Sequence, residues 1–254
     1  MSDEVPESPA TVDRARSFGS VAEAYDRGRP AYPAEAVGWL TGGEAKVVLE
    51  LGAGTGKLTR ELVDQGHASA VLEGSSASLE QVRAGEADEI AADAVRLSAS
   101  MLALAPLLKT APLQAIARLH TVVASSALSD DELGRPRDAA SADRLRGVSE
   151  LLLSGTSAPA LLVAAIVHAD VATAAPFASH NGIVARALER LVLVSRGVDA
   201  KSLVVPEAGH LAHRAAYESN LRAYRDGGPS GVHAWTLYGA EAFAAGAEAS
   251  PLRG

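Results

Sequence analysis

The chain has 254 residues, of which 48% are hydrophobic but only 4% aromatic, so small aliphatic side chains must fill the core of one large domain or of one domain with an appendage. Its formal net charge of −8 at pH 7 disfavours binding to nucleic acid or to an anionic membrane, which both require a basic surface. The absence of cysteine excludes disulfides, thiolate metal sites and cysteine nucleophiles.

The start of the chain does not have the pattern of a secretory signal. Residues 1–11 are polar and acidic, whereas such a signal begins with basic residues and continues with an apolar run. The longest apolar run, 158–167, is too short to cross a bilayer as a helix. We therefore expect a cytoplasmic protein that binds neither nucleic acid nor membrane.

The N-terminal part predicts a single βα unit. Residues 45–51 (AKVVLEL) are an apolar run bounded by glycines, which is typical of a buried strand. The pattern from Gly56 to Asp64 predicts the helix that follows.

Beyond residue 75 the spacing of apolar residues predicts helices almost throughout. The expected helices cover 76–104, 111–127, 139–154, 158–173, 182–196, 211–225 and 230–247. Only 202–205 suggests a strand. Thr110 and Ser157 stand at expected N-cap positions, each followed two residues later by a proline.

A glycine-rich loop follows the predicted strand, with the sequence Glu50-Leu-Gly52-Ala-Gly54-Thr-Gly56. Its glycines let the backbone approach a ligand closely, and the next helix would present its N-terminal N–H groups. With this loop, residues 14–66 resemble the class I S-adenosylmethionine-dependent methyltransferases. The resemblance implies that the glutamate and the three glycines bind S-adenosylmethionine.

The methyltransferase resemblance ends after this one unit. In that family an acidic residue holds the ribose hydroxyls, and Glu73 lies at about the right distance. A doubly wound sheet needs several more parallel strands, whereas residues 75–200 predict helices, and a lone βα unit cannot bury its strand on both faces. We therefore divide the chain into a methyltransferase-like fragment, 1–66, and a helical domain, 67–254.

A second motif lies between two predicted helices. The residues from Ala175 to Arg186 (APFASHNGIVAR) resemble the motif HPFxxGNGRxxR of the Fic/DOC (Fido) proteins, many of which transfer AMP from ATP to a protein hydroxyl. The residues that match the motif are Pro176, Phe177, Asn181, Gly182 and Arg186. The resemblance implies a mainly α fold, a Fic-like helical bundle, here with a short N-terminal βα appendage.

Four residues depart from that motif. Ala175 replaces the histidine that deprotonates the target hydroxyl, and Ser179 replaces the carboxylate that holds magnesium. His180 replaces the first glycine and Ile183 the first arginine. Because a general base must reach the hydroxyl proton, His180 is the candidate substitute for the missing histidine, while His168 is expected to pack within its own helix.

The motif keeps the residues that would bind phosphate. Helix 182–196 would begin beneath the phosphates with free N–H groups and the positive end of its dipole. Asn181 is expected to cap this helix, and the resemblance gives Asn181, Gly182 and Arg186 the role of nucleotide binding. Pro176 and Phe177 are expected to pack the loop.

An inhibitory segment precedes the domain. Ser69-Ala-Val-Leu-Glu73-Gly74 matches the inhibitory helix found ahead of many Fic cores, which has serine or threonine, three variable residues, glutamate, and then glycine or asparagine. The resemblance implies that Glu73 pairs with Arg186 and blocks productive ATP binding. Arg135 and Arg137 lie where Fic proteins place the flap that holds the target peptide, and the alternative is that both are solvated on a loop.

These features predict a protein with a Fido-like domain and a degenerate Fic motif, which binds a nucleotide or phosphate ligand and has weak or no AMP-transfer activity. The alternatives are an S-adenosylmethionine-dependent methyltransferase and a non-catalytic helical interaction protein. No cofactor is certain, and ATP with magnesium precedes S-adenosylmethionine as a candidate. A protein target is the expected partner. No metal site is assigned, because His210 and His213 lack a third ligand and are expected at the surface.

Overall fold

The computed structural model describes residues 57–249, which form helices joined by loops and contain no strand. The described elements are α4 (Lys57–Glu73), α5 (Leu79–Arg83), α6 (Glu89–Ser100), the 3-10 helix η2 (Met101–Leu104), α7 (Ala105–Thr110), α8 (Pro112–Ala124), α9 (Ala139–Leu153), α10 (Ala160–Ala174), α11 (Asn181–Ser195), α12 (Pro206–Ala212), α13 (Arg214–Asp226) and α14 (Pro229–Ala249). The predicted mainly α class is confirmed. The predicted strand 45–51 and the glycine-rich loop from Glu50 to Gly56 lie outside the described residues.

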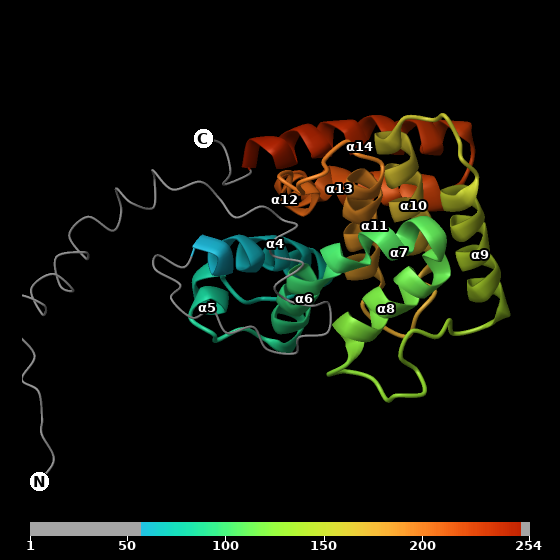
Figure 1. Cartoon of the computed structure of the whole chain (residues 1–254). Coiled ribbons are helices and arrows are strands. Elements are labelled where there is room, and N and C mark those ends of the chain that lie inside the picture. The colour runs from blue at the N-terminus through green and yellow to red at the C-terminus, as the bar shows by residue number, and fades with distance from the viewer. Residues whose placement is uncertain (1–56, 250–254) are drawn as a thin grey trace, which may run out of the picture.

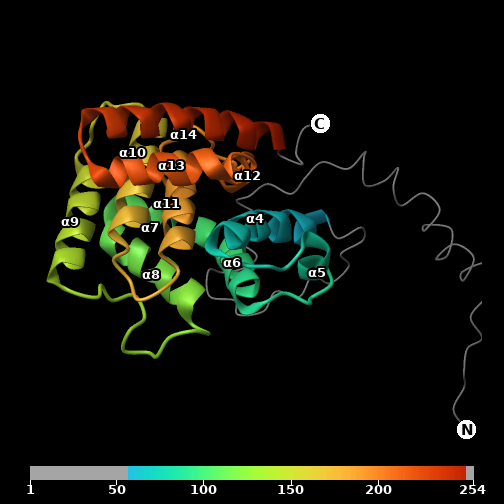
Figure 2. The ribbon, with the colours of Figure 1, turned by 180° about the vertical axis from the view of Figure 1, so that it is seen from behind.

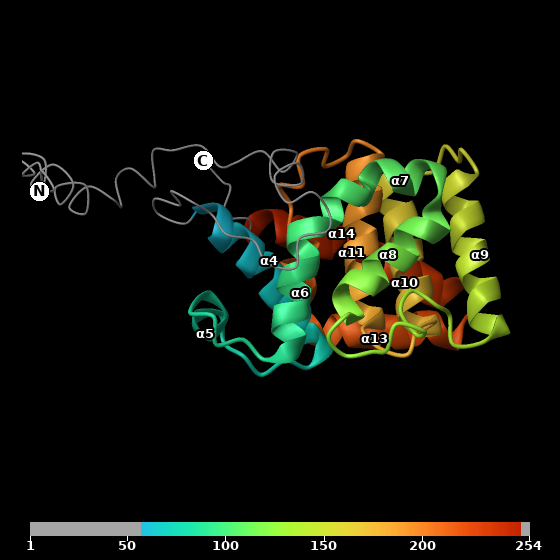
Figure 3. The same cartoon turned by 60° about the horizontal axis from the view of Figure 1, so that its bottom comes forward.

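Helix α11 is the central element of the domain. It contacts α4, α7, α8 and α10, and every residue from Ile183 to Leu193 is buried. Figure 1 shows α4, α5 and α6 at one end of the molecule and α9 at the other. The view from behind and the tilted view agree on this arrangement (Figures 2 and 3). A helix that is enclosed on all sides must pair every charged side chain that it carries, and this requirement shapes the site.

The predicted helix 76–104 is interrupted. Ser78 caps α5 in a reciprocal capping box with Gln81, and Asp88 caps α6 by accepting a hydrogen bond from the backbone N–H of Ala91. Between the two helices Gly85 takes a positive φ of 81°, which ends α5. The prediction of one long helix is therefore wrong, because local capping bonds overrode the apolar periodicity.

Three smaller expectations also need correction. Thr110 is the last residue of α7 rather than a cap, and Pro159 takes the N-cap position of α10 that we expected for Ser157. Residues 202–205 form a loop instead of a strand, and Ser202 takes a left-handed φ of 51°. The carboxylate of Asp199 accepts two backbone N–H groups from this loop at 2.8 and 2.9 Å, and these bonds hold it without a partner strand.

Helix α4 runs without a break across the predicted boundary at residue 66. At this point α4 and α6 approach closely, since a Cβ added to Gly66 would lie 2.6 Å from the Cα of Val95. The described part of the helix predicted from Gly56 to Asp64 and all but the last residue of the inhibitory segment from Ser69 to Gly74 are thus parts of one element. The division of the chain at residue 66 stays a prediction.

One stretch of the described residues, 89–110, is long and apolar enough to cross a membrane by length and composition alone. It consists of α6, η2 and α7 in succession. Leu97, Met101 and Leu108 on these elements are buried in the hydrophobic core. The packing of the domain therefore accounts for the apolar character of this stretch.

Gly66→Ala should destabilise the protein by about 1–3 kcal/mol, because the new methyl group meets backbone atoms of α6 that cannot move aside. Gly147→Ala is the matched control on α9, where nothing lies within 4 Å of an added Cβ. This change should stabilise the protein by about 0.5–1 kcal/mol. Urea unfolding of both variants measures the difference, and equal effects would contradict the close contact of α4 with α6.

Candidate functional site

The motif loop joins α10 to α11 through two residues with left-handed backbone conformation. Ala175 ends α10 with φ 43°, and His180 precedes α11 with φ 55°. Such a conformation costs a residue with a side chain roughly 1–2 kcal/mol. His180 stands where the Fic motif has glycine, so the loop keeps the shape that glycine favours although the residue has changed.

Asn181 fastens the loop to the start of α11. Its Oδ1 accepts the backbone N–H of Phe177 at 2.8 Å, and its Nδ2 donates to the carbonyl oxygen of Phe177 at 2.9 Å. The expectation that Asn181 caps α11 is wrong, because Asn181 is the first residue of the helix and its amide is used within the loop. Pro176 and Phe177 are buried, and the Phe177 ring stacks on His120 with 4.1 Å between the ring centroids.

Arg186 is buried one turn into α11, and all three nitrogen atoms of its guanidinium donate hydrogen bonds. Its Nε donates to Ser69 Oγ, and its Nη2 donates to Ser69 O and Glu73 Oε2, each at 2.9 Å. Its Nη1 donates to Tyr217 Oη at 3.2 Å. Burial alone would lower the pKa of Arg186, but Tyr217 and Glu73 outweigh it and raise the pKa. The structure thus brings Glu73 and Arg186 together as the resemblance implied.

The carboxylate of Glu73 also covers the first turn of α11. A Cβ added to Gly182 would collide with Glu73 Oε2, so any larger residue at this position would displace the carboxylate from the first turn. The first N–H groups of a helix have no partner within the helix and favour an anion. Glu73 therefore places a negative charge at the position where the Fic resemblance puts a phosphate.

The expected flap lies beside the motif loop. The backbone N–H of Arg137 donates to the carbonyl oxygen of Pro176 at 2.9 Å, and that of Gly134 donates to His120 Nδ1 at 2.9 Å. The side chains of Arg135 and Arg137 are exposed. A backbone hydrogen bond thus joins the expected flap to the motif loop, whereas the guanidinium groups of Arg135 and Arg137 are exposed to solvent.

His180, the candidate base, lies between two other side chains. Its Nδ1 is 2.7 Å from Ser179 Oγ, and its Nε2 is 3.3 Å from Oδ2 of Asp93 on α6. Burial would raise the pKa of Asp93, but the nearby ring of His180, the hydrogen bond from Ser126 and the charge of Arg96 outweigh it and lower the pKa. Asp93 is therefore ionised at neutral pH, and it faces the imidazole.

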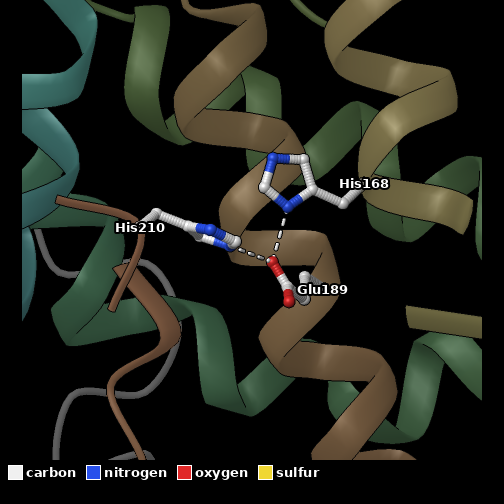
Figure 4. A group of neighbouring side chains, drawn as sticks. All are labelled: His168, Glu189 and His210. Carbon is white, nitrogen blue, oxygen red and sulfur yellow. Dashed lines mark hydrogen bonds and ion pairs between the residues drawn. The ribbon is translucent and has the colours of Figure 1, made fainter. Parts of the chain in front are cut away.

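A second polar group lies inside the domain, on the far side of Tyr217 from Arg186. Glu189 Oε2 is 2.5 Å from His168 Nδ1 and 2.9 Å from His210 Nε2 (Figure 4). The remaining ring nitrogens bond tyrosines, since His168 Nε2 lies 3.0 Å from Tyr217 Oη and His210 Nδ1 lies 3.0 Å from Tyr238 Oη. A chain of hydrogen bonds therefore runs from Arg186 through Tyr217 to this buried group.

The positions of the histidines confirm one expectation and overturn another. His168 packs inside the domain as expected. His210, expected at the surface, is completely buried, whereas His213 is exposed. The reason is that the chain turns between them: His210 belongs to the short helix α12, and His213 is the junction with α13.

His168, Glu189 and His210 are the group of described residues that could hold a metal ion, with one ligand atom each and all three atoms within 4.8 Å of one another. Two histidines and a carboxylate suit several divalent metals. Every ring nitrogen already has a hydrogen-bond partner, however, so the arrangement is complete as a network of side chains. The expectation of no metal site stays a prediction.

Burial sets the charges of this network. It lowers the pKa of His168 to about 4, against the attraction of Glu189. Burial would raise the pKa of Glu189, but His210 and His168 outweigh it and hold the pKa well below its usual range. Burial also raises the pKa of Tyr217. At neutral pH the network therefore contains an ionised Glu189 beside a neutral His168 and a protonated Tyr217.

Three of the side chains around the motif loop and Arg186 were not predicted from the sequence. Asp93, His120 and Tyr217 come from α6, α8 and α13, and nothing in their local sequence distinguishes them. Their roles follow only from how the helices pack. Ser69 could have been found, because it is the first residue of the inhibitory segment.

Comparison with solved structures shows a Fic-like fold. The chain is similar to a Fic family protein from Desulfovibrio desulfuricans, with a TM-score of 0.60 and 17% identity over 98% of this chain and 76% of that one. It is also similar to Fic-1 from C. elegans, with a TM-score of 0.56 and 21% identity over 93% of this chain and 75% of that one. No protein-family model matches the chain.

Comparison with curated proteins finds a different relative for the N-terminal region. Over 54 residues the chain is 59% identical to uncharacterized methyltransferases of Mycobacterium bovis and Mycobacterium tuberculosis. The match covers 21% of this chain and only 22% of the length of those proteins. The two resemblances found in the sequence are therefore both supported, and the Fic-like one accounts for the fold.

The protein should lose stability as the pH falls from about 6.5 to about 4. Burial lowers the pKa values of both His120 and His168 from 6.5 to about 4, so in this window the unfolded chain binds more protons than the folded one. Above pH 6.5 the two rings are neutral in both the folded and the unfolded state, so they no longer make the stability depend on pH. Urea unfolding at several pH values measures the slope.

In His120→Gln the new side chain does not titrate, so the unfolded chain binds one proton fewer than the unfolded wild type in this window. Its slope should be shallower than that of the wild type by up to about 1.4 kcal/mol per pH unit in the same window. Gln114→Asn, on the exposed face of the same helix, serves as the control. An unchanged slope in His120→Gln would contradict the assignment of a neutral buried ring.

Proposed function

We propose that the protein binds a nucleotide or a related phosphate ligand at the motif loop, and that Glu73 inhibits this binding. The observation that carries the proposal is the buried pair of Glu73 and Arg186 at the first turn of α11, where Nη2 of the arginine lies 2.9 Å from the carboxylate. Arg186 is the motif residue that can offer two parallel donors to a phosphate. Glu73 occupies one of these donors and covers Gly182.

AMP transfer by this loop is weak or absent in our proposal. Ala175 has no group that accepts a proton, and Ser179 has no charge with which to hold magnesium, on which phosphoryl-type transfer depends. ATP with magnesium is the first ligand to test. We further propose a cytoplasmic protein with a protein target, without binding to nucleic acid or membrane, in keeping with the net charge of −8.

A second candidate function is methyl transfer from S-adenosylmethionine. The 59% identity to methyltransferases over 54 residues favours it. The all-helical packing of 57–249 provides no parallel sheet in the described part of the chain, so we rank this function below nucleotide binding. A third candidate is a non-catalytic helical protein that binds a protein partner and neither ligand.

Glu73→Gly should strengthen the binding of ATP with magnesium. Removal of the carboxylate releases one N–H donor of Arg186 Nη2, while Ser69 and Tyr217 still hold the rest of the guanidinium. It also uncovers the first turn of α11, although the variant melts at a lower temperature because Arg186 loses a partner. The measurement is the rise in melting temperature that the ligand causes in each variant. A ligand at 100 times its dissociation constant stabilises the folded state by about 2.7 kcal/mol, which such a melt resolves.

Two variants control this experiment. Glu86→Gly removes an exposed carboxylate between α5 and α6 and should leave the effect of ATP unchanged. Adding Arg186→Gln to Glu73→Gly should abolish the gain. No effect of ATP on Glu73→Gly would refute nucleotide binding, and an effect of S-adenosylmethionine alone would favour the methyltransferase.

A further inference from the structure

We propose that Ser179, His180 and Asp93 form a nucleophile, a base and an orienting carboxylate, and that Ser179 cleaves small carboxylic esters through an acyl-serine intermediate. The three side chains follow one another at hydrogen-bond or ion-pair distance. Ser179 Oγ lies 2.7 Å from His180 Nδ1, and His180 Nε2 lies 3.3 Å from Asp93 Oδ2. This activity goes beyond nucleotide binding. Two of its three residues, Ser179 and His180, stand at positions where the sequence departs from the Fic motif.

The surroundings of Asp93 fix which atom faces the histidine. Oδ1 already accepts hydrogen bonds from Ser126 Oγ at 2.6 Å and from Arg96 Nη1 at 2.7 Å. Oδ2 is buried and makes no hydrogen bond. The ring nitrogen Nε2 of His180 faces it at 3.3 Å, which is an ion-pair distance. The free oxygen of a nearly buried carboxylate is therefore directed at His180 Nε2.

The position of Asp93 determines the tautomer of the imidazole. A carboxylate oxygen 3.3 Å from Nε2 favours the ring proton on that nitrogen, which leaves Nδ1 with its lone pair. Nδ1 then accepts the hydroxyl proton of Ser179. This is the order of roles in a serine triad, with the two ring nitrogens exchanged.

The backbone after Ser179 supplies donors for the developing negative charge. His180 makes a turn at a φ of 55°, and α11 begins immediately after it at Asn181. The first N–H groups of that helix have no partner within the helix, and the Glu73 carboxylate, which lies over the same turn at Gly182, must move aside when an ester carbonyl binds there. A nucleophile on a sharp turn before a helix, with backbone N–H groups beside it, is the arrangement that stabilises the oxyanion in acyl transfer.

The reaction balances with water as the only co-reactant. Ser179 Oγ bonds to the ester carbonyl carbon while its proton passes to His180 Nδ1. The bond from that carbon to the alkoxy oxygen then breaks, and the alcohol leaves with the proton from Nδ1. Water, deprotonated in the same way, attacks the acyl carbon and releases a carboxylic acid and free Ser179.

The first test uses the full chain and a fluorophosphonate, which bonds to an activated serine oxygen and releases fluoride. Peptide mass spectrometry should find the probe on Ser179, and Ser179→Ala should not carry it. His180→Gln and Asp93→Asn should each slow the labelling at least about tenfold. Ser76→Ala, which removes an exposed hydroxyl, is the control and should leave the rate unchanged.

Hydrolysis of p-nitrophenyl acetate should follow the same order of variants. A folded wild-type protein that carries no probe on Ser179 would overturn the proposal, and this result requires no variant to fold. Labelling of Ser179 at full rate in a folded His180→Gln would also overturn it. Circular dichroism establishes that each variant is folded.

A separate arm distinguishes this activity from nucleotide binding. In our proposed function, ATP with magnesium should slow the labelling of Ser179 in Glu73→Gly, because both ligands use the first turn of α11. Labelling of Ser179 that ATP does not slow would count against the nucleotide site and would leave the nucleophile supported. Protection by ATP would support both.

Discussion

The charge of Arg186 in the interior is the constraint on which the rest of the site depends. An unpaired guanidinium in a buried position costs several kcal/mol, so the fold must bring partners to it. It does so from two directions: α4 supplies Ser69 and Glu73, and α13 supplies Tyr217. Tyr217 Oη in turn lies 3.0 Å from His168 Nε2, and the other ring nitrogen of His168 lies against the carboxylate of Glu189. The positions of α4, α10 and α13 around α11 are thus linked by one chain of polar contacts inside an apolar core.

The sequence predicted those parts of the site that lie within a continuous motif. Glu73 and Arg186 could be paired in advance because each belongs to a short pattern whose members have fixed roles. Asp93, His120 and Tyr217 could not, since a lone polar residue on an amphipathic helix has the same appearance whether it faces water or a site. His210 shows this limit most clearly, because its spacing from His213 indicated a shared helix face, whereas the chain turns between them. The break in the helix predicted over 76–104 has a related cause. The capping hydrogen bonds of Ser78 and Asp88 depend on single polar residues, and the spacing of apolar residues carries no information about them.

The motif loop combines a backbone shape that suits glycine with side chains that differ from the Fic motif. His180 has a left-handed conformation, which glycine adopts most readily, and Asn181 ties the loop to the start of α11. The histidine and the carboxylate of the Fic motif are replaced by Ala175 and Ser179, whereas Asn181, Gly182 and Arg186 match it. Ser179 and His180, which stand at two of the differing positions, lie 2.7 Å apart and can exchange a proton with each other. Strain at a loop is retained only when the surrounding structure enforces it. Here Phe177, buried and stacked on His120, and the side-chain amide of Asn181 together hold the loop in shape.

Helix α4 explains how a segment related to methyltransferases can precede a Fic-like domain without disturbing it. The contacts of this helix with the arginine and with α6 lie after residue 65: Gly66 packs against Val95, and Ser69 and Glu73 reach Arg186. The turn before that point also belongs to the domain, since Val63 is buried in the core and Asp64 pairs with Arg83 of α5. A junction inside a helix preserves the periodicity of the hydrogen bonds across it, whereas a junction in a loop would leave the direction of the inhibitory segment unspecified. The continuity of α4 therefore fixes the angle at which Glu73 meets α11.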